Sequence, residues 1–115
     1  IPSFRLPPEV LDEEIAAIVD MGVEVRYNSP VESLGALLDA KQFDAVFVGS
    51  GAPKGKELEI PGRRDSDQVF IGIEWLESIH FGHVDSVGKR VLIIGVGNTA
   101  MDCCRSAKRL GATDV

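Results

Sequence analysis

One short stretch constrains the fold of this chain of 115 residues more than any other. The apolar residues 91–94 lead directly into a glycine-containing turn, and an amphipathic helical pattern follows it over residues 98–110. The turn has the spacing G-x-G-x-x-A and consists of Gly95-Val96-Gly97-Asn98-Thr99-Ala100. This spacing carries a defined mechanism only when a buried strand precedes it and a helix follows it, and both conditions are met here.

Each small residue of this motif has a distinct predicted role. Gly95 permits a tight turn, Gly97 lets a diphosphate approach the backbone, and Ala100 lets the helix pack close to the strand. The amino end of the helix offers unpaired N–H groups and a partial positive charge to phosphates, and Asn98 and Thr99 add side-chain donors. The motif therefore predicts dinucleotide binding; the alternative is a glycine-rich turn that only packs tightly.

The motif also bears on the extent of the chain. The acid or arginine that reads the ribose is expected about 20 residues beyond the glycines of such a unit, whereas only 20 residues follow Gly95. We therefore expect these residues to be a segment of a longer enzyme.

The remaining pattern predicts alternating helices and strands. Helices are expected from the acidic stretch after Pro8 to Gly22, after a capping Ser33, and around Trp75. Strands are expected at residues 23–27, 45–48 and 90–94, the last two buried on both faces, and another begins at residues 112–115. The predicted fold class is α/β, a Rossmann-like parallel-sheet fragment.

Charge and cysteine content exclude several classes of function. The net charge is −6, and residues 1–50 hold nine acids and three bases, whereas residues 51–115 hold nine of each. An acidic chain without a basic stripe argues against a nucleic-acid or membrane-surface partner. The only cysteines, Cys103 and Cys104, are adjacent and so cannot form an unstrained disulfide, which favours a reducing, cytoplasmic setting.

A second glycine-rich segment follows the predicted strand at residues 45–48. It consists of Gly49-Ser50-Gly51-Ala52, and Ile60-Pro61-Gly62 comes after it. Ligands of open α/β sheets sit at the carboxyl ends of strands. Taken alone, the segment is equally compatible with a ligand approach and with a tight turn.

A family resemblance runs in order through nearly the whole chain. Its residues are Phe4-Arg5-Leu6-Pro7, Glu9-Val10-Leu11, Gly22-Val23, Phe43-Asp44-Ala45-Val46-Phe47-Val48-Gly49-Ser50-Gly51-Ala52, Ile60-Pro61-Gly62, Gly88-Lys89-Arg90-Val91 through Asp102, and Arg109-Leu110-Gly111-Ala112. These residues resemble the small (beta) subunit of NADPH-dependent glutamate synthase and the electron-entry half of dihydropyrimidine dehydrogenase. In that family an NAD(P)H domain interrupts an FAD domain, NADPH reduces FAD, and electrons leave through iron–sulfur clusters toward a partner.

The resemblance implies a division of this chain and roles for its residues. Residues 1–68 would be the end of an FAD half-domain, 69–87 a connector, and 88–115 the opening βα unit of an NAD(P)H domain. The motif from Gly95 to Ala100 would lie against the NADPH diphosphate. Arg5 would face FAD, Val31 its adenosine end, and Gly49, Ser50, Gly51 and Ala52 the flavin nucleotide.

The resemblance also indicates what lies elsewhere. The family's first FAD fingerprint, its cluster cysteines, the return half of its FAD domain and the arginines that read a 2′-phosphate are absent from these residues. We therefore expect this segment alone to hold no FAD tightly and to catalyse no reaction. Iron–sulfur clusters and a larger catalytic subunit or electron-acceptor protein are expected outside the segment. The terminal acceptor and the choice of NADPH over NADH stay open. A non-catalytic NAD(P)-binding module and a subunit-assembly segment are the alternatives.

Other reactive side chains have simpler interpretations. No catalytic residue and no metal ligand is predicted: His80 and His83 lack nearby carboxylates or thiols, and Asp102 is expected in a helix-dipole or packing role. The two cysteines are expected to act as small, partly buried apolar residues rather than as a redox pair. Three charged neighbours are expected in a solvated loop: Arg63-Arg64-Asp65.

Overall fold

The computed structural model describes residues 1–115 and contains four helices and no β-sheet. The chain divides into two compact units. One unit consists of Ile1–Pro8 together with Ala52–Val115, and the other is Glu9–Gly51. No helix combines the length and the apolar character that crossing a membrane requires.

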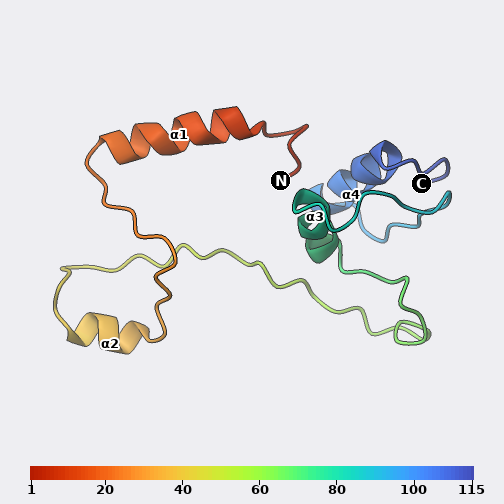
Figure 1. Cartoon of the computed structure of the whole chain (residues 1–115). Helices are drawn as coiled ribbons and strands as arrows, with labels where there is room; N and C mark the ends of the chain where they lie inside the picture. Colours follow the sequence, from red (N-terminus) through yellow and green to blue (C-terminus); the bar gives the residue numbers. More distant parts are fainter. The chain divides into compact units, whose positions relative to one another are not determined.

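The unit Glu9–Gly51 contains helices α1 (Pro8–Asp20) and α2 (Leu34–Asp39) (Figure 1). Proline at the first helical position suits α1, because its missing N–H has no partner there in any case. The helix ends where Gly22 takes a φ of +96°, as predicted. Helix α2 begins at the predicted cap, since the Ser33 hydroxyl accepts a hydrogen bond of 3.2 Å from the Ala36 N–H.

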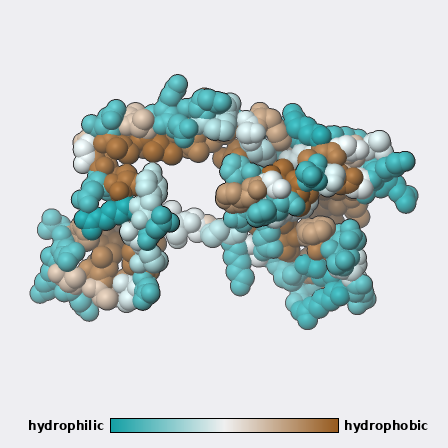
Figure 2. Space-filling view, in the orientation of Figure 1, coloured by the Kyte–Doolittle hydropathy of each residue, from teal (hydrophilic) through white to brown (hydrophobic).

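The apolar face of α1 lies at the surface of the structure. Its side chains are between 38% and 50% exposed, and they are Val10, Leu11, Ile15, Ile18 and Val19. Figure 2 shows this apolar surface in brown along the helix. Helix α1 therefore forms where the sequence predicts it, but its apolar face stays exposed.

The unit formed by Ile1–Pro8 and Ala52–Val115 is built around helices α3 (Gly72–His80) and α4 (Asn98–Arg109), which pack against one another (Figure 1). Its buried residues all lie on α4 or just after it, and they are Ala100, Asp102, Cys103, Ser106, Ala107 and Ala112. The core is small because none of these six side chains is larger than that of an aspartate. Helix α4 ends at Arg109, and Gly111 follows it with a φ of +103°, which favours glycine.

The segments on either side of α4 run parallel where they meet. Arg90 and Asp114 form a parallel bridge, and the Val91 N–H donates to the Asp114 carbonyl at 2.9 Å. The N–H groups of Thr113 and Asp114 both donate to the Lys89 carbonyl at 2.9 Å. This pairing joins the start of the predicted strand at residues 90–94 to the predicted strand at residues 112–115.

The predicted strands otherwise do not form. Residues 23–27 and 45–48 make no backbone hydrogen bond to another segment. The side chains expected to be buried are exposed: Phe47 is 94%, Leu92 87% and Ile94 69% exposed. A strand is stable only when neighbours take up its backbone N–H and C=O groups, and here no second strand lies alongside. The complete parallel sheet and the three-part domain division stay predictions.

Candidate functional site

The glycine turn before α4 has the local geometry that its spacing predicts. Gly95 has a φ of +139°, in the left-handed region that favours glycine. A Cβ at this position would lie 3.4 Å from the Cβ of Ala100, whose residue is 9% exposed. The turn and the first turn of α4 are therefore in van der Waals contact, and the positive φ disfavours any residue other than glycine at position 95.

Gly97 differs from Gly95 because its surroundings are open. It is the N-cap of α4, with an extended φ of −81° and ψ of 178°, and nothing lies within 4 Å of where its Cβ would stand. No side chain caps the helix, and the first main-chain bond of the turn runs from the Met101 N–H to the Gly97 carbonyl at 3.1 Å. The amide groups of Asn98, Thr99 and Ala100 precede that bond and have no acceptor within the helix.

This end of α4 has the properties of an anion-binding site. Free N–H groups and the positive end of the helix dipole favour a phosphate. Asn98 and Thr99 are exposed, and Val96 is 94% exposed, so no neighbouring side chain closes the site. The geometry fits a phosphate-containing ligand; that the ligand is a dinucleotide stays a prediction.

The amino end of α3 lies beside the site, which sequence reasoning missed. A Cβ on Gly72 would lie 3.2 Å from the Cys103 Sγ and 3.5 Å from the Thr99 Cγ2. The Cys103 thiol also donates to the Gly72 carbonyl at 3.7 Å. Gly72 thus permits the close approach of α3 and α4. Its only sequence signal is a glycine at the first position of a helical pattern.

The segment before α1 is also attached to α4. The Arg5 Nη2 lies 3.4 Å from the Asp102 Oδ2, and the Arg109 guanidinium carbon lies 3.8 Å from the centre of the Phe4 ring. Asp102 is only 3% exposed, which agrees with the predicted packing role. The structure therefore brings Arg5 into the same unit as the glycine motif. Its contact with a flavin stays a prediction.

The other predicted flavin contacts lie largely in the second unit. Val31 lines an open hollow of about 470 Å³ beside α2, together with Ser33 and Leu37. Gly51 has a φ of +70°, and a Cβ on Gly49 would lie 3.0 Å from the Phe47 ring. Gly51 therefore adopts a backbone conformation that favours glycine, and a side chain at residue 49 would press against the Phe47 ring. The role predicted for these residues is untested.

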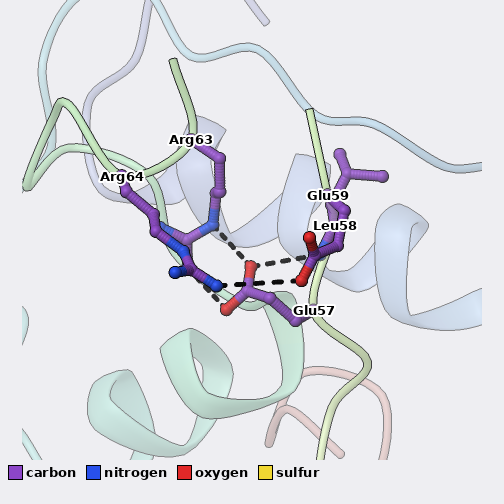
Figure 3. Close-up of polar contacts among 5 residues, drawn as sticks. All are labelled: Glu57, Leu58, Glu59, Arg63 and Arg64. Carbon is purple, nitrogen blue, oxygen red and sulfur yellow. Dashed lines mark hydrogen bonds and ion pairs between the residues drawn. The ribbon is translucent and has the colours of Figure 1, made fainter. Parts of the chain in front are cut away.

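The arginine pair at residues 63–64 forms ion pairs within its own loop, as Figure 3 shows. The Arg63 Nε and Nη2 donate to the two carboxylate oxygens of Glu57 at 2.6 and 3.2 Å, and Arg64 lies 3.8 Å from Glu59. A hydrogen bond from the Leu58 N–H and the neighbouring Arg63 lower the pKa of Glu57. The loop lines a hollow of about 340 Å³, but its own acids offset the arginine charges.

The histidines and cysteines form no metal site. No group of three or more potential metal-ligating side chains occurs. The His80 and His83 rings lie 5.1 and 6.3 Å from the Phe81 ring. Cys103 is buried and Cys104 half-buried, as predicted for packing residues. Burial, with smaller contributions from Cys104 and Asp102, raises the pKa of the Cys103 thiol to about 11, which makes it a poor nucleophile near neutral pH.

Known proteins similar to this chain are subunits of NAD(P)H-dependent oxidoreductases. The beta subunit of the NADPH-Fe(3+) oxidoreductase of Geobacter sulfurreducens is 37% identical over 99% of this chain and 17% of that protein. The dihydropyrimidine dehydrogenase subunit PreT of Salmonella typhimurium, which is NAD-dependent, is 38% identical over 100% of this chain and 28% of that protein. The glutamate synthase (NADPH) small chain of Azospirillum brasilense is 31% identical over 100% of this chain and 26% of its own length.

No protein-family model and no solved structure matches the chain. The chain spans between 17% and 28% of the length of the three curated relatives described above. The similarity nevertheless covers essentially the whole chain. The predicted resemblance is therefore confirmed: this chain is homologous, along its full length, to one segment of NAD(P)H-dependent oxidoreductase subunits that include the glutamate synthase small chain and the dihydropyrimidine dehydrogenase subunit PreT.

Proposed function

We propose that this chain is the part of a flavin-dependent oxidoreductase, of the glutamate synthase small-chain type, in which NADPH meets FAD. The observation that carries the proposal is the open amino end of α4. Its N–H groups are uncapped, and Gly97 leaves the space in front of them free. A diphosphate needs these two properties together.

The chain's own residues bind and orient in this proposal, and they perform no acid–base step. The amides after Gly97 hold the NADPH diphosphate, while Asn98 and Thr99 donate from their side chains. Arg5 supplies a cation to the FAD diphosphate, and Val31 and residues 49–52 contact the flavin nucleotide. NADPH and FAD together supply the hydride chemistry. Orientation is the contribution of the protein, because hydride transfer requires the nicotinamide to stack on the flavin.

The proposed architecture is an α/β fold whose parallel sheet surrounds these residues. The parallel bridge between Arg90 and Asp114, on either side of α4, supports a β–α–β connection. The exposed Phe47, Leu92 and Ile94 are apolar side chains that neighbouring strands of such a sheet would cover. We further propose that a larger subunit or an electron-acceptor protein, reached through iron–sulfur clusters, takes the electrons onward in the cytoplasm.

The proposal is tested in the complete flavoprotein that carries this segment. Gly97→Val places a branched side chain in front of the free amides, and Gly88→Val is the matched control. The control position is also a glycine with an ordinary φ, and only the Arg90 carbonyl, at 4.0 Å, lies near its Cβ. We expect Gly97→Val to weaken NADPH binding at least about tenfold, and Gly88→Val to leave it within about twofold.

Stopped-flow absorbance then distinguishes an enzyme from a binding module. NADPH mixed with the oxidised protein is expected to bleach the flavin absorbance, and Gly97→Val is expected to slow the bleaching at subsaturating NADPH. Binding of NADPH without bleaching would instead identify a non-catalytic module. Equal affinities of the Gly97→Val variant and the unmodified protein would refute the proposed site.

A further inference from the structure

The Asp102 carboxylate is buried on α4, where a negative charge needs a cation or hydrogen-bond donors to stabilise it. The side chain of Asp102 is 5% exposed, and its Oδ1 has no hydrogen-bond partner. Its Oδ2 lies 3.4 Å from the Arg5 Nη2, and this is its only ion pair. A buried carboxylate is costly unless a cation or several donors compensate it. Arg5 therefore supplies the one compensating charge that the structure offers to Asp102.

A second contact holds the same segment on the same side of α4. The Arg109 guanidinium lies over the ring of Phe4, the neighbour of Arg5, at 3.8 Å. Asp102 and Arg109 are seven positions apart, which is close to two helical turns, so both lie on one side of the helix. The Arg5 N–H also donates to the Pro2 carbonyl at 2.9 Å, which closes a turn at the base of the segment.

The Arg5 guanidinium keeps most of its donors available. A guanidinium has about five N–H donors, and the only partner of the Arg5 side chain is Asp102. Its side chain is 35% exposed, whereas that of Asp102 is 5% exposed. One side of this cation is therefore anchored on a buried acid while another faces outward. An arginine held in this way is preorganised to bind a phosphate, because less rotamer freedom is lost on binding.

We propose that Asp102 is a positioning residue that holds Arg5 on α4, so that the outward donors of Arg5 meet the flavin diphosphate. This inference rests on the proposed function. Helix α4 then serves both nucleotides, through its amino end for NADPH and through Asp102 for the cation that binds FAD. The carboxylate touches neither nucleotide and acts only through Arg5.

The test is a double-mutant cycle in the complete flavoprotein, with Asp102→Asn, Arg5→Gln and the double variant. Asparagine keeps the shape of the side chain and removes its charge. Apoprotein is titrated with FAD, and binding is followed by quenching of flavin fluorescence and by the visible absorption spectrum. We expect each single variant to weaken FAD binding about tenfold and Asp102→Asn to perturb the flavin spectrum. We expect the double variant to bind FAD no more weakly than Arg5→Gln alone, because both changes remove one interaction.

The matched control is Glu24→Gln, which removes the acid of another arginine pair. The Arg26 Nε donates to Glu24 at 2.7 Å, and both side chains are more than 70% exposed. We expect this variant to bind FAD within about twofold of the unmodified protein. NADPH affinity should change less than about twofold in Asp102→Asn, since the amides at the start of α4 remain.

Three results would overturn the positioning role. The first is unchanged FAD binding in Asp102→Asn. The second is a double variant whose loss of FAD binding free energy equals the sum of the two single losses. The third is an Asp102→Asn variant that loses as much affinity for NADPH as for FAD. If Asp102→Asn does not fold, Arg109→Gln tests the second contact. We expect Arg109→Gln to weaken FAD binding about threefold. An FAD affinity equal to that of the unmodified protein would overturn the proposal. An unmodified protein that binds FAD but is not bleached by NADPH would instead refute the proposed function.

Discussion

The two glycines of the motif before α4 should respond in opposite ways to the same substitution. Gly95→Ala places a Cβ at a φ of +139° and 3.4 Å from the Ala100 Cβ. Backbone strain of this kind costs about 1–3 kcal/mol. The alanine also lowers the entropy of the unfolded chain, which offsets about 0.4–1 kcal/mol. We therefore expect Gly95→Ala to reduce the local stability of the turn and of α4 by about 1–2 kcal/mol.

Gly97→Ala should leave stability nearly unchanged and still weaken nucleotide binding. The backbone of Gly97 is extended, and the space at its Cβ is empty. Alanine is a poorer N-cap than glycine by about 0.5–1 kcal/mol, and the entropic gain of about 0.4–1 kcal/mol cancels this cost. The added methyl group nevertheless stands where the proposed diphosphate would approach the free amides, so we expect the NADPH dissociation constant to rise severalfold.

Hydrogen exchange and nucleotide titration separate the two effects in the complete protein. Each 1.4 kcal/mol of local stability is about a factor of ten in the exchange rate of the α4 amides. Gly95→Ala should accelerate their exchange about five- to thirtyfold, whereas Gly97→Ala should change it less than about threefold. The reverse order, with Gly97→Ala the more destabilising variant, would refute the structural argument for both glycines.

Three further predictions concern single contacts. Ser33→Ala removes the cap of α2 and should cost that helix about 1 kcal/mol, measured as faster amide exchange over residues 36–39; unchanged exchange would contradict the capping role. Gly72→Val should separate α3 from α4 by its collision with the Cys103 thiol, so Cys103 should react faster with a thiol reagent, and an unchanged rate would show that the packing is not close. In Cys104→Ser, Cys103 is the only thiol of this chain, and its alkylation rate should rise about tenfold per pH unit from about pH 8 to about pH 10. The reason is that burial raises the pKa of its thiol to about 11 and only the thiolate reacts. A rate that levels off near pH 9 would contradict this.

Local signals were sufficient to predict the helices. Pro8 at the start of α1, Ser33 before α2 and Gly111 after α4 act on the neighbouring turn of the backbone, and the structure uses each as its type predicts. The close contact between Gly95 and Ala100 was predictable for the same reason, since only five positions separate them. Such features depend on a few consecutive residues and on no distant partner.

Contacts between segments that are distant in the sequence could not be predicted in the same way. The apolar runs at residues 45–48 and 90–94 predict buried strands. In the structure no neighbouring strand pairs with them beyond the bridge at Arg90, and Phe47 and Leu92 are exposed. The approach of Gly72 to Cys103 joins positions that are 31 apart in the chain. The local sequence around Gly72 or around Cys103 does not predict that contact.

The site thus combines a local feature, the free amides at the amino end of α4, with contacts from distant segments that hold the helix in place. The two contribute differently to the proposed function. The amino end of α4 attracts a phosphate by itself, because its free amides and dipole are properties of any uncapped helix. The proposed hydride transfer would demand more, since the donor and acceptor rings must be held in one relative geometry and small misplacements lower the rate steeply. Gly72 and the Arg5–Asp102 pair restrain α4 from two separate segments of the chain. Substitutions in the motif should therefore act mainly on NADPH affinity. Substitutions in the restraints should leave NADPH affinity nearly unchanged and lower the rate of flavin reduction at saturating NADPH, and those in the Arg5–Asp102 pair should also weaken FAD binding.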